Sequence, residues 1–83
     1  MLALEEEHPE PGPAVLLSLG LTPRQAEVAY WVAQGKTNPE IAVILGASPR
    51  TIDKHMERIL ARLGVENRVA LIVHTSALLR PNR

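Results

Sequence analysis

Four basic side chains recur at every fourth position within one segment of this 83-residue chain. A helix places positions four apart near one another on its surface, so together they form a slowly turning stripe: Arg50, Lys54, Arg58 and Arg62. Long cationic donors of this kind reach guanine acceptors and the phosphates of duplex DNA. The alternative interpretation is a solvated helix face whose bases pair within the helix, with Asp53 and with Glu57.

The stripe lies on the second of two helices expected around a short turn. Proline, glycine and capping residues predict helices over residues 39–45 and 49–63, with Gly46 between them. Thr37 or Asn38 is the expected N-cap of the first helix, and Ser48 that of the second. Two helices joined by such a turn are typical of the helix-turn-helix unit, whose second helix enters the major groove. The unit requires a small residue at the crossing, here Ala42, and apolar residues between the helices, such as Ile41 and Ile52. A plain helical hairpin is the alternative, and the geometry alone does not decide between them.

Two further helices complete the expected domain. Thr22 and Gln25 form a capping box before a helix running to about residue 34, and Asn67 caps a last helix running to about residue 79. No period-two alternation predicts a strand. The expected fold is therefore all-α, a four-helix bundle-like domain containing a helix-turn-helix.

Charge divides the chain into two parts. Residues 1–20 contain four glutamates and no lysine or arginine, whereas residues 21–83 contain nine bases and five acids. Residues 1–13 are also rich in proline, which predicts a linker, and the apolar run 14–19 predicts a turn that docks on the core. We therefore expect a linker with a docking segment over residues 1–20 and the helical domain over residues 21–80.

Several functional classes are disfavoured by composition. The chain has no cysteine, and His8, His55 and His74 are isolated, so neither a metal site nor a cofactor is expected. No catalytic constellation is recognisable, so an enzyme is not expected. The apolar stretch 69–79 is too short to span a membrane, and there is no signal peptide, which favours a cytoplasmic location.

Residues 21–68 resemble the DNA-binding domain of the LuxR family of bacterial transcription regulators, also called the GerE or NarL type. The matching pieces are Leu21-Thr22-Pro23-Arg24, Ala33-Gln34-Gly35, Asn38 with Glu40-Ile41-Ala42, Ser48 with Thr51-Ile52 and His55, and Leu63-Gly64-Val65 with Arg68. The resemblance implies the C-terminal domain of a larger regulator, binding an inverted-repeat site in double-stranded DNA as a homodimer. Further partners would be an upstream sensor or receiver domain and RNA polymerase.

The residues expected at the DNA surface combine the basic stripe with the starts of the two helices. They are Asn38, Ser48, Arg50, Thr51, Asp53, Lys54, His55, Arg58 and Arg62. Asn38, Ser48 and Thr51 are expected first as caps, and exposed helix starts also hold phosphates. Asp53 and Glu57 depart from the usual family pattern and place acids beside a surface meant for phosphates.

The last helix is apolar on almost every side, which predicts a second buried surface besides the core. We assign that surface to a twofold dimer contact formed by Leu71, His74, Thr75 and Leu78. Packing against an upstream domain or against residues 14–19 is the alternative. The rival function from another class is a helical protein-interaction module with weak or lost DNA binding.

Overall fold

The computed structural model describes residues 11–80, which contain four α-helices, one 3-10 helix and no strand. The elements are η1 (Pro13–Leu19), α1 (Pro23–Ala33), α2 (Asn38–Leu45), α3 (Pro49–Leu63) and α4 (Arg68–Ser76). The expected all-α fold is therefore confirmed. Most of the expected linker, over residues 1–13, lies outside the described residues.

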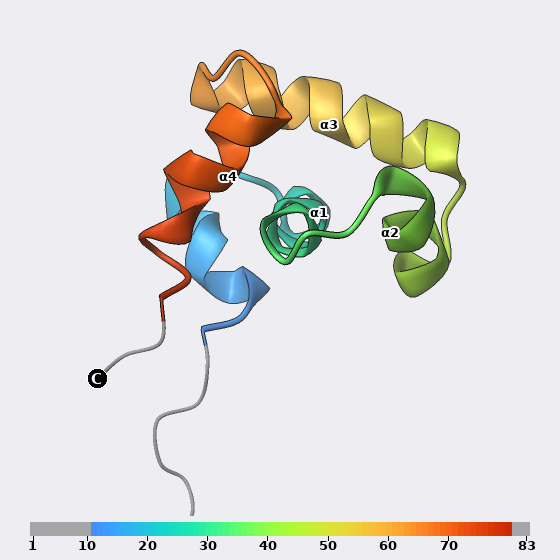
Figure 1. Ribbon diagram of the computed structural model, residues 1–83, viewed down its shortest axis with the longest axis horizontal. Helices are drawn as coiled ribbons and strands as arrows, with labels where there is room; N and C mark the ends of the chain where they lie inside the picture. Colours follow the sequence, from blue (N-terminus) through green and yellow to red (C-terminus); the bar gives the residue numbers. More distant parts are fainter. Residues whose placement is uncertain (1–10, 81–83) are drawn as a thin grey trace, which may run out of the picture.

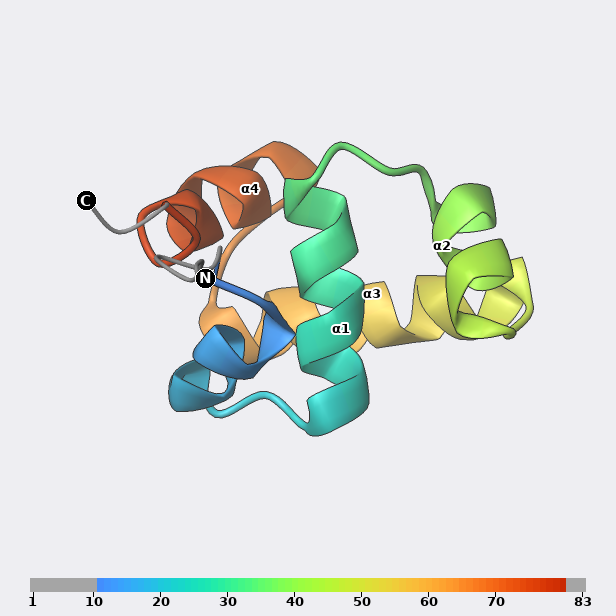
Figure 2. The same cartoon turned by 90° about the horizontal axis from the view of Figure 1, so that it is seen from below.

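Helix α1 lies at the centre and packs against each of the other four elements. Figure 1 looks along α1, with α3 above it, α2 on one side, and α4 and η1 on the other. Figure 2 shows α1 crossing in front of α3. Every element adds at least one fully buried side chain to a single core, among them Leu16, Val28, Ile41, Ile52, Ile59 and Leu71.

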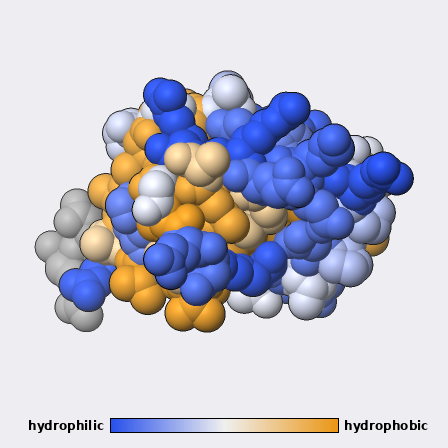
Figure 3. Space-filling view, turned by 90° about the horizontal axis from the view of Figure 1, so that it is seen from above, coloured by the Kyte–Doolittle hydropathy of each residue, from blue (hydrophilic) through white to orange (hydrophobic). Residues whose placement is uncertain are grey.

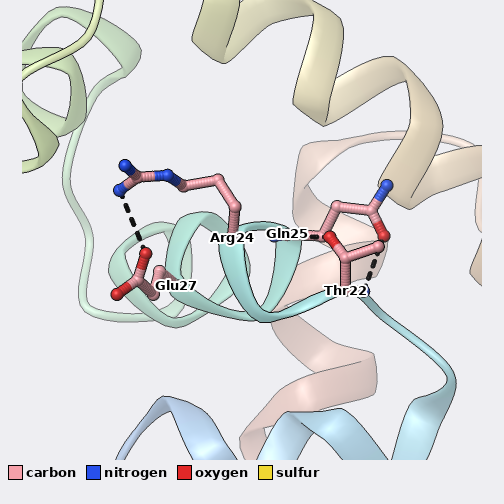
Figure 4. Close-up of polar contacts among 4 residues, drawn as sticks. All are labelled: Thr22, Arg24, Gln25 and Glu27. Carbon is pink, nitrogen blue, oxygen red and sulfur yellow. Dashed lines mark hydrogen bonds and ion pairs between the residues drawn. The ribbon is translucent and has the colours of Figure 1, made fainter.

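The helix starts follow the capping residues. The Gln25 backbone N–H donates to Thr22 Oγ1 at 3.2 Å, and Gln25 Oε1 accepts from the Thr22 backbone at 3.0 Å. This is the expected capping box, and the adjacent Arg24–Glu27 ion pair of 3.0 Å lies on the same turn (Figure 4). Thr37 and Glu40 form a second capping box at the start of α2. The cap of α2 is therefore Thr37, one residue before Asn38.

The first element and the last helix compare differently with what the sequence predicts. The run 14–19, expected as a docking turn, lies in the 3-10 helix η1, whose Leu16 is fully buried. Helix α4 ends at Ser76, earlier than the expected residue 79, and turns follow it. The hydroxyls of Thr75 and Ser76 donate to the carbonyl oxygens of Leu71 and Val73, both at 3.0 Å, and such back-bonding disfavours continuation of a helix.

Candidate nucleic-acid interface

The turn between α2 and α3 is built from residues 46–48. Gly46 adopts a left-handed backbone conformation with φ of 66°, which residues with a side chain rarely take. The Ala47 backbone N–H then donates to the Ala42 carbonyl at 2.8 Å and closes the end of α2. Ala42 is 2% exposed, and Ile41 and Ile52 are fully buried. The compact helix-turn-helix arrangement is thus present, and it leaves one side of α3 uncovered.

Helix α3 has one apolar and one charged side. Ile52, Met56 and Ile59 are buried in the core, whereas all members of the basic stripe are exposed: Arg50, Lys54, Arg58 and Arg62. Figure 3, seen from the α3 side, shows mostly hydrophilic residues over this helix and hydrophobic residues gathered at one end of the molecule. Within residues 11–80 the only ion pair within 4.0 Å is Arg24–Glu27. The alternative of a stripe paired to its own helix is therefore not what the side chains adopt.

The start of α3 is exposed and capped by Ser48. Ser48 Oγ accepts from the Thr51 backbone N–H at 3.1 Å and lies 3.0 Å from the Thr51 hydroxyl. Both expected residues thus sit at the first turn, where the backbone N–H groups of a helix start attract anions. The capping role of Ser48 is confirmed. The expected capping role of Thr51 is wrong, because Thr51 lies inside the helix and its backbone N–H is the donor that Ser48 caps.

The far end of the stripe contacts the loop between η1 and α1. Gly20 has φ of 86°, and a Cβ atom built on it would lie 2.6 Å from Arg62 Nη2. The Arg62 guanidinium therefore lies directly over the Gly20 backbone. Gly20 and Arg62 line an open hollow at the surface. Arg58 lines it too, together with Thr22 and Gln25 at the start of α1.

Asn38 does not stand free at the start of α2. Its Nδ2 donates to Asp53 Oδ1 at 2.8 Å, and its Oδ1 accepts from Arg68 Nη1 at 2.7 Å. The other Arg68 terminal nitrogen, Nη2, donates to the Lys36 carbonyl. Of the two expected caps, Thr37 and Asn38, it is Thr37 that caps α2, and the Asn38 amide joins two other elements instead. Arg68 had no role assigned from the sequence, because its partners lie about 30 residues away in the chain.

His55 is half-buried beside the exposed stripe, and its buried Nδ1 atom has no hydrogen-bond partner. No group of three or more His, Cys, Asp or Glu side chains in the described part of the chain is arranged to hold a metal ion. His55 therefore stays a DNA-contact prediction, on a side chain that is less accessible than Lys54 beside it.

The expected assembly surface on α4 needs correction. Leu71 and Thr75 are both fully buried, because their side of the helix faces the core, so neither can contact a second chain. His74 is exposed, and Leu78 is 37% exposed. The apolar residues that α4 leaves open are Val69 and Val73, which are 69% and 67% exposed and lie one turn apart.

No helix in residues 11–80 has both the length and the apolar character needed to cross a bilayer.

Comparison with known proteins places this arrangement in a family. The family model for bacterial regulatory proteins of the luxR family matches residues 19–75. The chain is 49% identical over 47 residues to the transcriptional activator protein YukR of Yersinia ruckeri, covering 57% of this chain and 20% of that protein. It is 39% identical over 64 residues to the transcriptional activator protein AhyR of Aeromonas hydrophila, covering 75% of this chain and 25% of that protein.

A third relative is the HTH-type quorum sensing-dependent transcriptional regulator RpaR of Rhodopseudomonas palustris, which is 41% identical over 58 residues, or 70% of this chain and 24% of that protein. The chain thus spans a fifth to a quarter of the length of these curated relatives. The matched residues include the last residue of η1, the whole of α1, α2 and α3, and α4 as far as Thr75. The chain belongs to the luxR family of bacterial regulatory proteins.

Proposed function

We propose that this chain is the DNA-binding output domain of a bacterial transcription regulator, with α3 as the helix that enters the major groove. The observation that carries the proposal is the exposed basic stripe of α3, whose members make no ion pair among residues 11–80. Lys54 and Arg58 contact base edges, while Arg50 and Arg62 contact flanking phosphates. The exposed first turn of α3 adds a backbone site for a phosphate.

The position of the chain ends supports an output role. The two ends of the described residues lie near one another in both views, and Figure 1 shows them on the side away from α3 (Figures 1 and 2). A sensor or receiver domain joined through residues 1–20 would therefore leave α3 free, and residues 21–80 would form the DNA-binding domain. We place its action in the cytoplasm, where bacterial DNA is, with RNA polymerase as a further partner.

A twofold dimer is the proposed functional assembly, with its contact moved to Val69 and Val73 of α4. Exposed valines one turn apart form an apolar strip, and His74, next to Val73, and Leu78, just beyond α4, are also exposed. A twofold contact repeats the same patch on both copies and sets two recognition helices about one DNA turn apart. The corresponding DNA site is an inverted repeat.

The rival function, a helical protein-interaction module, has its own supporting observation. Val43 of α2 is 81% exposed and Ile44 is 43% exposed, so α2 carries an apolar patch that a protein partner could cover. Asp53 and Glu57 would in that case mark a surface that has lost DNA affinity. A module of this kind binds duplex DNA without a steep dependence on salt, if it binds at all.

Selection of binding sites from a random duplex pool tests the proposed function. We expect an enriched inverted repeat with half-sites about one helical turn apart. An enriched single half-site would contradict the dimer alone, and a pool that stays random while the domain is folded would favour the interaction module.

A further inference from the structure

Three charged or polar side chains from three different elements form one continuous hydrogen-bonded chain. Arg68 at the start of α4 donates to Asn38 at the start of α2, and Asn38 donates to Asp53 of α3. Arg68 also bonds the Lys36 carbonyl in the loop before α2. In the sequence, Asn38 is 15 residues from Asp53 and 30 from Arg68, so the link is entirely tertiary.

The chemistry of the two ends fixes the direction of the Asn38 amide. A guanidinium only donates and an ionised carboxylate only accepts, so the amide oxygen must face Arg68 and the amide nitrogen must face Asp53. Both hydrogen bonds therefore have an ionised partner, which makes them stronger than neutral pairs. The oxygen and one of the two N–H groups of Asn38 are thereby used within the protein.

The Asn38–Asp53 hydrogen bond adds a directional contact to the apolar packing of α3. Ile52, Met56 and Ile59 hold α3 by apolar burial, which is non-directional and sets depth better than rotation. The Asn38–Asp53 hydrogen bond is directional and joins the DNA-facing helix to α2 close to the exposed Lys54. Base recognition depends on the direction of each donor, so a small rotation of α3 changes which bases are contacted.

We propose that Asn38 is a positioning residue: oriented by Arg68, it holds Asp53 and so fixes the rotation of α3 at which Lys54 meets base edges. Asn38 thus acts on recognition through Asp53, and not by contacting DNA itself. This inference rests on the proposed function, because it concerns how the same helix enters the groove. It gives a structural reason why Asp53, whose charge repels phosphates, lies on the surface proposed to bind them.

A double-mutant cycle separates positioning from direct contact. Asn38→Ala, Asp53→Ala and the double variant are compared with wild type for binding to the selected duplex and to a random duplex. Circular dichroism first establishes that each variant is folded at the binding temperature. We expect Asn38→Ala to weaken binding to the selected duplex about tenfold, and to change random binding less than about twofold because no charge is altered. In the Asp53→Ala background the same change should cost less than about twofold.

The opposite outcomes are equally clear. If Asn38→Ala costs the same in both backgrounds, Asn38 contacts DNA directly and the positioning role is wrong. If it leaves the preference for the selected duplex unchanged in the wild-type background, the role is also wrong. If the wild type binds neither duplex, the proposed function is overturned, and the positioning role with it. If the wild type binds but the effects of the two substitutions are additive, only the positioning role is overturned.

A polarity swap gives a second test that does not rely on truncation. Asn38→Asp places two carboxylates face to face and should abolish the preference for the selected duplex. Adding Asp53→Asn lets the acid at position 38 accept both from Arg68 and from the new amide, with the net charge of the wild type. We expect the double variant to recover the ratio of selected to random affinity to within about threefold of wild type. A double variant that keeps the ratio of Asn38→Asp alone would overturn the positioning role.

Discussion

The Asp53 carboxylate on α3 accepts a hydrogen bond of 2.8 Å from the Asn38 amide on α2. The acid that the charge pattern presents as unfavourable for phosphate binding thus also joins α3 to α2. In the proposed function, the charge of Asp53 opposes DNA binding, while its hydrogen bond orders the surface proposed to meet DNA. We therefore expect its removal to have two effects of opposite sign on binding, which experiments on different duplexes separate.

Asp53→Lys should tighten binding to random duplexes and steepen the salt dependence by roughly one phosphate contact, because a repelling charge becomes an attracting one. The preference for a selected site should fall, because the tether to Asn38 is lost. Glu57→Lys is the matched control: it makes the same charge change on α3 at an exposed acid outside the Arg68–Asn38–Asp53 network. Equal effects of the two variants on the selected and random duplexes, measured by fluorescence anisotropy, would contradict this expectation.

Gly20→Ala should displace the Arg62 guanidinium, since the new Cβ would lie 2.6 Å from Nη2. Gly35→Ala is the matched control, because Gly35 has a similar φ of 89° and nothing within 4 Å of its Cβ position. Both variants should lose about 1–2 kcal/mol of stability from the positive φ. Only Gly20→Ala should also reduce the salt slope of DNA binding by about one contact. Equal slopes for both variants would remove Arg62 from the phosphate contacts.

Val73→Asp should give a folded chain with weakened self-association and poorer binding to an inverted repeat, because one half-site loses the other as a tether. Leu71→Ala should instead destabilise the fold by about 2–5 kcal/mol, since Leu71 is fully buried in the core. Sedimentation velocity and thermal melts distinguish the two. A Val73→Asp chain that dimerises as wild type does would show that the assembly contact lies elsewhere.

Much of this fold follows from local signals in the sequence. Thr22 with Gln25, Ser48 and Gly46 mark helix boundaries through contacts only a few residues apart, and the structure places the boundaries of α3 where those residues predict. The burial of Ile52, Met56 and Ile59 likewise follows from helical spacing. Such contacts join residues three or four apart, so residue type and spacing indicate them.

The remaining features depend on the assembled chain. Helix α4 is apolar on several sides, so its pattern does not specify which side faces the core, and Leu71 and Thr75 were assigned to the wrong one. The Asn38–Arg68 bond and the approach of Arg62 to Gly20 join residues from distant parts of the chain. No spacing rule connects such pairs, because their distance is set by the packing of whole helices.

Acid should weaken the α2 cap through Glu40. The Thr37 backbone N–H donates to the Glu40 carboxylate at 2.8 Å, and this bond lowers the pKa of Glu40 below its ordinary value. The resulting stabilisation is fully present above the pKa of the unfolded chain and is lost as the pH falls through the lower pKa of the folded chain. Glu40→Gln keeps an acceptor for Thr37 but does not titrate, so its melting temperature should fall less between neutral and acid pH. Parallel pH profiles for the two chains would contradict the assignment.

The groove role of α3 is tested most directly by binding to a duplex across a range of salt concentrations, for wild type, Lys54→Ala and Arg80→Ala. Arg80→Ala removes the same charge from an exposed residue outside α3, at the end of the described chain. We expect wild-type affinity to fall steeply with salt, Lys54→Ala to lose about 1–3 kcal/mol on the selected duplex, and Arg80→Ala to match wild type. Wild-type binding that is absent or insensitive to salt, or equal losses in the two variants, would contradict the assignment of DNA recognition to α3.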